Sequence, residues 1–189
     1  MAISRPWVML VSEPIVTILA IYNSIIYGTT YMMFAAFPVV FQQGRGWSPG
    51  VGGLAFIGIA IGMAVANLSM IWINRKYTTD SRNSPGHSLQ PEIRLVLCFA
   101  GSIAIPIGLF WFACANSATV PWEVCAAATI LFGFGNVSVS IGLTNYFVDI
   151  YSIYAASALA ATTVLRSLFG AAFPLFTPGM YSRLGIHWA

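Results

Sequence analysis

Long apolar runs with almost no charge are the feature that most constrains this sequence. Each of five runs is about 20 residues or longer, the length that an α-helix needs to cross ~30 Å of hydrocarbon. Lipid offers no hydrogen-bond partners, so a backbone that crosses it must satisfy its own polar groups, as a helix does. The runs are apolar on every side rather than alternating, which excludes the strands of a membrane β-barrel. The predicted spans cover residues 14–41, 51–73, 93–115, 122–147 and 152–176.

The composition agrees with a protein that is surrounded by lipid. Of the 189 residues, 58% are hydrophobic and 7% are charged, whereas a soluble domain carries about 25% charged residues. Such hydrophobicity also excludes intrinsic disorder. The net charge of +3 is not gathered into a basic stripe, so we expect no nucleic-acid partner. The sequence therefore predicts an all-α membrane protein, a helical bundle with membrane lipid around it.

Lysine and arginine residues near the ends of the spans predict the orientation of the chain. Positive residues collect on the cytoplasmic side of membrane proteins. With five spans, five of these residues fall on one side and two on the other. We therefore expect a cytoplasmic N-terminus and a cytoplasmic loop over residues 74–92. The larger group is Arg5, Arg75, Lys76, Arg82 and Arg94, and the smaller group is Arg45 and Arg183.

Arg166 is the most notable charged residue, because it lies near the middle of a predicted span. A charge at this depth costs about 2.5–3.5 kcal/mol on insertion scales, so it needs a cavity or a polar partner. Two interpretations stay open: Arg166 organises a cavity or a gate, or it clamps helix carbonyls or a carboxylate. Asp149 is the nearest carboxylate along the chain, but ~1.5 Å of rise per residue places it too far away within one helix. We expect Asp149 to make a contact at the membrane boundary.

Polar and small residues share one face of the fourth span. Their spacing of three and four residues places them on a single helical face, which in a membrane turns toward water or toward another helix. Two interpretations stay open: this face lines a substrate cavity, or its small residues allow a neighbouring helix to approach closely. The face comprises Thr129, Gly133, Asn136, Ser140 and Thr144.

A second face, on the first span, combines aromatic rings with polar tips. Such surfaces bind amphipathic or cationic ligands through stacking and cation–π contacts. The alternative is that its phenylalanines face lipid or anchor the span at the membrane interface. Pro38 on this face removes a backbone hydrogen bond and should kink the helix. The face comprises Asn23, Tyr27, either Thr30 or Tyr31, Phe34, Pro38 and Phe41.

Small residues in two other spans predict close helix packing. Gly58 and Gly62 form the Gly-x-x-x-Gly pattern that is typical of packed membrane helices, and Gly170 adds a small residue to the fifth span. We find no combination of serine, histidine and carboxylate that suggests catalysis, and no cysteine spacing that suggests a metal site. The sequence therefore predicts neither an enzyme nor a bound cofactor.

Long motifs that run through nearly the whole chain carry a family resemblance. They are Glu13-Pro14, GWSPG at 46–50, PEIRL at 91–95, NYFVD at 145–149 and LRSLFGAAFPLF at 165–176. On these motifs the chain resembles the C-terminal half of fungal major facilitator superfamily transporters. The likeness is to the drug:proton antiporter branch, which includes polyamine and azole exporters.

The resemblance implies that the five spans correspond to helices 7 to 11 of a 12-helix fold, whose seventh and tenth helices usually line a central cavity. It implies proton-coupled export of small amphipathic or cationic compounds, with the plasma membrane as the expected location. Because such substrates bind between two six-helix halves, transport would require the N-terminal half as a partner. The alternative is a truncated fragment that does not transport, or an assembly partner. The substrate-facing residues would be Asn23, Tyr27, Tyr31, Asn136, Ser140 and Thr144.

Overall fold

The computed structural model describes residues 5–83, 95–116 and 120–184, and nearly all of these residues are helical. These three ranges contain no strand. Segment η1 is a π-helix and η3 is a single 3-10 turn. The elements in chain order are α1 (Arg5–Ser12), α2 (Pro14–Phe37), η1 (Pro38–Gly44), α3 (Pro49–Gly53), α4 (Phe56–Asn83), α5 (Leu95–Ala115), α6 (Trp122–Tyr151), η3 (Ser152–Tyr154) and α7 (Ala155–Leu184).

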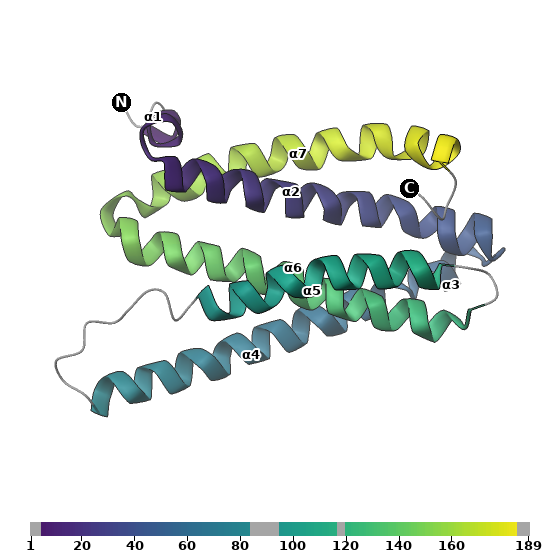
Figure 1. Cartoon of the computed structure of the whole chain (residues 1–189), viewed down its shortest axis with the longest axis horizontal. Helices are drawn as coiled ribbons and strands as arrows, with labels where there is room; N and C mark the ends of the chain where they lie inside the picture. The colour runs from purple at the N-terminus through teal and green to yellow at the C-terminus, as the bar shows by residue number, and fades with distance from the viewer. Residues whose placement is uncertain (1–4, 84–94, 117–119, 185–189) are drawn as a thin grey trace.

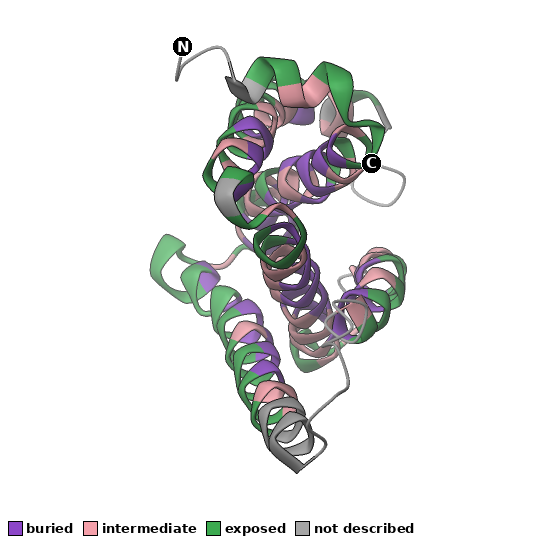
Figure 2. Cartoon of the chain, turned by 90° about the vertical axis from the view of Figure 1, so that its left-hand side faces the viewer, coloured by how far each residue is buried: buried purple, intermediate pink, exposed green. Residues whose placement is uncertain are grey.

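The long helices form two groups that lie against each other (Figure 1). In the first group, α2 and α7 run side by side. In the second group, α6 packs along both α4 and α5. Figure 2 looks along the bundle and shows that the buried residues gather where helix faces turn toward one another. The contact of α6 with both α2 and α7 connects the two groups.

Five of the described helical stretches are long and apolar enough to cross a membrane. Together with the absence of strands from the described ranges, they confirm the prediction of an all-α membrane bundle. The stretches are Pro14–Gly44, Pro49–Arg75, Leu95–Ala115, Trp122–Tyr151 and Ala155–Tyr181.

The helices extend further than the hydropathy pattern indicates. Helix α6 continues to Tyr151, beyond its expected end, because Asp149 in its last turn is exposed and need not be buried. Helix α4 continues to Asn83, well into the expected loop 74–92. The remainder of that loop lies outside the described residues.

Prolines alter the hydrogen-bond pattern within the helical stretches, but the chain stays helical beyond them. At Pro38 the chain passes from α2 into the π-helical segment η1, which continues to Gly44. Proline has no N–H to donate to the carbonyl four residues earlier, so the regular α-helical pattern is interrupted there. Helix α7 likewise contains Pro174 and Pro178 in its second half. Neighbouring helices and local adjustments make such residues tolerable in membrane helices.

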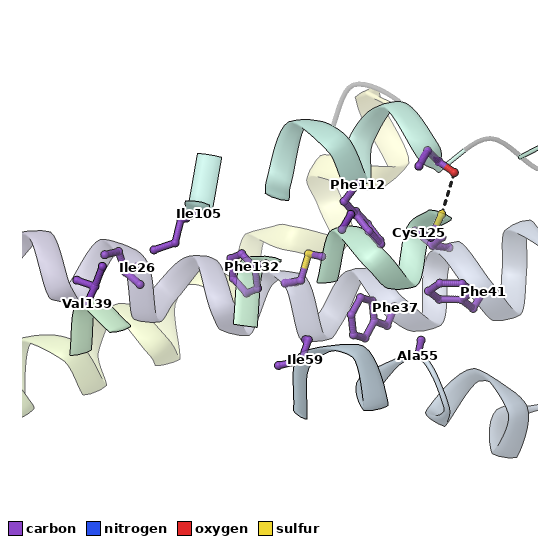
Figure 3. Packing of buried hydrophobic residues seen from close by; sticks show 14 of the residues in the cluster. Ile26, Phe37, Phe41, Ala55, Ile59, Ile105, Phe112, Cys125, Phe132 and Val139 are labelled. Atoms are coloured by element: carbon purple, nitrogen blue, oxygen red, sulfur yellow. Dashed lines mark hydrogen bonds between the residues drawn. The ribbon is translucent and has the colours of Figure 1, made fainter. Parts of the chain in front are cut away.

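A cluster of buried apolar residues joins the two groups of helices (Figure 3). Phe37 on α2 places its ring centroid 5.9 Å from that of Phe112 on α5. Outside the cluster, its centroid also lies 4.7 Å from that of Phe56 on α4. Phe132 on α6 belongs to the same cluster and is fully buried. Aromatic pairs at these distances contribute about 0.5–1.5 kcal/mol beyond their burial. The α2 helix is therefore anchored to all three helices of the other group.

Glycines bring α4 into backbone contact with α6. A Cβ atom on Gly58 would lie 2.8 Å from the carbonyl oxygen of Ala126, and one on Gly62 would lie 2.8 Å from the backbone nitrogen of Phe134. Both distances are shorter than real Cβ contacts, and the opposing atoms are backbone atoms that cannot rotate away. Gly133 on α6 fits against α4 in the same way. This crossing therefore depends on residues without a side chain.

Large apolar side chains cover the outward faces of the bundle. On α5, Phe99 is 68% exposed and Phe110 is 74% exposed, and on α7 Leu175 is 83% exposed. A soluble protein rarely leaves such surfaces to water. These faces are suited to contact with lipid tails.

Candidate functional site

Two hydrogen bonds connect polar side chains of α2 and α6. Asn136 Nδ2 donates to Thr30 Oγ1 at 2.8 Å, and Ser140 Oγ donates to Asn23 Oδ1 at 3.4 Å. The two helices are antiparallel, so the pair nearer the start of α2 lies nearer the end of α6. Asn23 is 7% exposed and Asn136 is 8% exposed. Both amides therefore lie inside the contact between α2 and α6.

A pair of tyrosines occupies the neighbouring face of α2, where that helix meets α7. Tyr27 and Tyr31 are one helical turn apart, with ring centroids 5.0 Å apart and hydroxyl oxygens 3.2 Å apart. Tyr31 is 37% exposed, and Tyr27 is half-buried. Gly170 on α7 makes room for both rings, because a Cβ atom there would lie 2.9 Å from Tyr27 Cε1 and 3.4 Å from Tyr31 Cδ2.

Arg166 lies one turn before Gly170 on α7 and reaches the same tyrosine. Its guanidinium carbon is 4.8 Å from the centroid of the Tyr27 ring, which is within range of a cation–π interaction. Such an interaction contributes about 0.5–2 kcal/mol. Arg166 Nε is buried and has no hydrogen-bond partner among the described residues. Tyr27 therefore orients the guanidinium of Arg166, but at least one hydrogen-bond donor of Arg166, Nε, has no partner among the described residues.

The remaining predicted residues lie apart from these contacts. Thr144 is exposed and donates a hydrogen bond to the carbonyl of Ser140 on its own helix. Asp149 is exposed near the end of α6, at the edge of the apolar stretch. Gly58 and Gly62 lie at the crossing of α4 with α6 and contribute no functional group.

The structure thus gathers the other predicted residues into two neighbouring sets. We call Tyr27, Tyr31, Arg166 and Gly170 the arginine–tyrosine cluster, and we call the two hydrogen-bonded pairs between α2 and α6 the amide seam. The sequence left open whether Thr30 or Tyr31 belongs to the aromatic face of the first span. In the structure, these two residues have different surroundings. Thr30 is buried in the amide seam, whereas Tyr31 is exposed in the arginine–tyrosine cluster.

The two sets offer groups for hydrogen bonding, cation–π contact and stacking. The arginine–tyrosine cluster offers a cation, two phenolic hydroxyls and two ring faces, and the amide seam offers buried amides and hydroxyls. Among the described residues, no group of three or more histidine, cysteine, aspartate or glutamate side chains is placed to hold a metal ion. Aromatic walls with a few convergent polar groups are typical of small-molecule binding sites.

Comparison with curated proteins finds relatives that match the chain from end to end. The chain is 55% identical over 188 residues to the MFS-type efflux pump MFS2 of Trichophyton rubrum. This match covers 100% of this chain and 31% of that protein. It is 54% identical to the efflux pump FUB11 of Gibberella moniliformis over 100% of this chain and 32% of that protein. It is 52% identical to the major facilitator superfamily multidrug transporter mdrA of Aspergillus fumigatus over 100% of this chain and 31% of that protein.

The chain spans about a third of the length of these curated relatives. No family model and no solved structure matches it. The matched third contains all five apolar stretches together with the arginine–tyrosine cluster and the amide seam.

Proposed function

Because the chain belongs to the major facilitator superfamily of transporters, we propose that it forms one wall of the substrate path of an exporter of small amphipathic compounds. The observation that carries this proposal is the match of 188 residues, at 55% identity, to a protein named an efflux pump. Chains that are this similar over their matched length share the same arrangement of helices. The five membrane-spanning stretches then correspond to helices 7 to 11 of the transporter.

The substrate wall consists of α2 and α6, with α7 beside them. Transporters of this kind bind their substrates near the middle of the bilayer, between two halves that rock against each other. We propose that the arginine–tyrosine cluster faces this path and that the N-terminal half of the transporter covers it. The amide seam lies behind the cluster and holds α2 against α6. In this arrangement Tyr27, Tyr31 and Arg166 contact the substrate directly.

The orientation and the location of the transporter are part of the proposal. Arg75 is the last residue of the second apolar stretch and is exposed, and further basic residues precede the first and third stretches in the sequence. By the positive-inside rule, these ends and the N-terminus lie in the cytoplasm. We propose the plasma membrane as the location and proton coupling as the energy source, as the family resemblance implies.

An efflux assay with the full-length transporter tests the function. Yeast cells that lack their own multidrug pumps would express it and be loaded with cationic rhodamine 6G, anionic fluorescein or neutral Nile red. We expect lower accumulation of at least one dye than in cells with an empty vector. Equal accumulation of all three dyes would contradict the proposed export.

Two substitutions test the site. We expect Asn136→Ala and Arg166→Ala each to reduce efflux of the exported dye, because the first loosens the amide seam and the second removes the cation. Arg183→Ala is the matched control, since Arg183 is exposed in the last turn of the same helix. Full efflux in both site variants would remove the site assignment while leaving the transport function in place.

A further inference from the structure

The interiors of the five spans contain a positive charge, Arg166, but no negative charge. The chain has five acidic residues, and each lies outside the spans or within two residues of a span end. Arg166, in contrast, lies eleven residues after the start of the fifth span at Ala155 and fifteen before its end at Tyr181. The acidic residues are Glu13, Asp80, Glu92, Glu123 and Asp149.

At its position Arg166 needs a cavity, a polar partner or an anion, and the interiors of these spans contain no carboxylate. A buried cation is tolerated in a membrane when it faces a cavity or an opposite charge. Its aromatic neighbour, Tyr27, is neutral, and the guanidinium carbon lies over the face of the Tyr27 ring. Arg166 Nε is buried and has no hydrogen-bond partner among the described residues, so these residues do not satisfy all the donors of the guanidinium. An arginine edge is the group best suited to bind a carboxylate, through two parallel hydrogen bonds.

The surroundings of Arg166 suit the apolar part of the same ligand. Tyr31 is 37% exposed beside Tyr27, and the ring of Phe34 follows at 6.0 Å from that of Tyr31. These rings rise along one face of α2 and form a continuous aromatic surface next to the cation. The close fit of Gly170 keeps the tyrosine rings against α7, next to the turn that carries Arg166.

We infer that the arginine–tyrosine cluster binds the carboxylate of a small aromatic compound, so that the transporter prefers amphipathic anions to cations. Arg166 binds the carboxylate, the Tyr31 hydroxyl adds a donor, and the rings of Tyr31 and Phe34 stack on the aromatic part. This inference rests on the proposed export function and narrows its substrate class. A cationic ligand at this site would have to bind beside a guanidinium, without any carboxylate from the interior of these spans.

A binding assay on the purified full-length transporter in detergent tests the inference. The probes are tritiated 1-naphthoate, 1-naphthamide and 1-naphthylmethylammonium, which share a ring system and differ in charge. We expect the strongest binding for 1-naphthoate. Arg166→Gln should weaken naphthoate binding about tenfold or more, because hydrogen bonds to charged groups are the strong ones, and should leave naphthamide binding nearly unchanged.

Three further variants keep the test decisive. Arg166→Lys retains the charge and should retain part of the naphthoate binding, although it cannot form two parallel hydrogen bonds. Tyr31→Phe removes only a hydroxyl and should weaken naphthoate binding about threefold, even if Arg166→Gln does not fold. Arg183→Gln removes the same charge from an exposed position of α7 and should have no effect. Each variant must first give a monodisperse size-exclusion peak.

Two results would overturn the inference. One is equal or stronger binding of the ammonium probe. The other is an equal loss of all three probes in Arg166→Gln, which would show that Arg166 pairs with an acidic residue elsewhere in the transporter. Either result would leave the dye-efflux evidence for export intact, so the two proposals fail separately.

Discussion

Replacing Gly62 with alanine tests whether backbone contact holds α4 against α6. The added Cβ atom would lie 2.8 Å from the backbone nitrogen of Phe134 and 2.9 Å from the carbonyl carbon of Ile130, where ordinary contact begins at 3.4 Å. Neither atom belongs to a side chain that can rotate, so the helices must separate by roughly 0.5–1 Å, which forfeits a quarter to a half of each contact's attraction. Such overpacking typically costs about 1–3 kcal/mol.

The intrinsic preference of helices for alanine opposes this cost. Alanine is favoured over glycine by about 1 kcal/mol in a helix interior, so we expect a net loss of up to about 2 kcal/mol for Gly62→Ala. The control is Gly53→Ala at the end of α3, where a Cβ atom would have nothing within 4 Å. Thermal unfolding of the detergent-solubilised full-length transporter, followed by size-exclusion chromatography, measures both variants. We expect Gly62→Ala to lower the unfolding temperature by a few degrees and the control to leave it unchanged. Equal unfolding temperatures would refute the argument from backbone contact.

Two further predictions concern the candidate site. A double-mutant cycle of Asn136→Ala and Thr30→Val should give a coupling energy of about 0.6 kcal/mol, and at most ~1.7 kcal/mol, in the free energy of unfolding. Additive effects of the two substitutions would show that the 2.8 Å hydrogen bond between these side chains contributes nothing to stability. Gly170→Ala should displace the Tyr27 ring, which can rotate, so we expect weaker dye efflux with a smaller change of unfolding temperature than for Gly62→Ala. Unchanged efflux in Gly170→Ala would mean that the ring position is unimportant for transport.

Hydropathy predicts the five spans because lipid allows so few backbone structures. A long uncharged run must become a helix, so the spans follow from composition alone. The helix ends cannot be predicted from hydropathy in the same way. Helix α6 continues past Asp149 and helix α4 continues past Arg75, because a helix can extend into water beyond the membrane.

The surroundings of individual side chains were harder to predict. Helical periodicity places Asn23 and Tyr27 on one face of the first span, but it does not tell which neighbour each one meets. In the structure, Asn23 is buried against α6, whereas Tyr27 contacts α7. That difference depends on the rotation of α2 between two neighbouring helices, which a single sequence does not contain. The contact of Arg166 with Tyr27 joins residues far apart in the chain and was not predicted for the same reason.

Pro174 has a mechanical consequence for α7. It follows Gly170 by four residues and lacks an N–H, so the carbonyl of Gly170 receives no helical hydrogen bond. Bending the helix at this point therefore breaks one backbone hydrogen bond fewer than elsewhere in α7. The segment from Pro174 to Leu184 can tilt at a lower energetic cost than the part of α7 that carries Arg166.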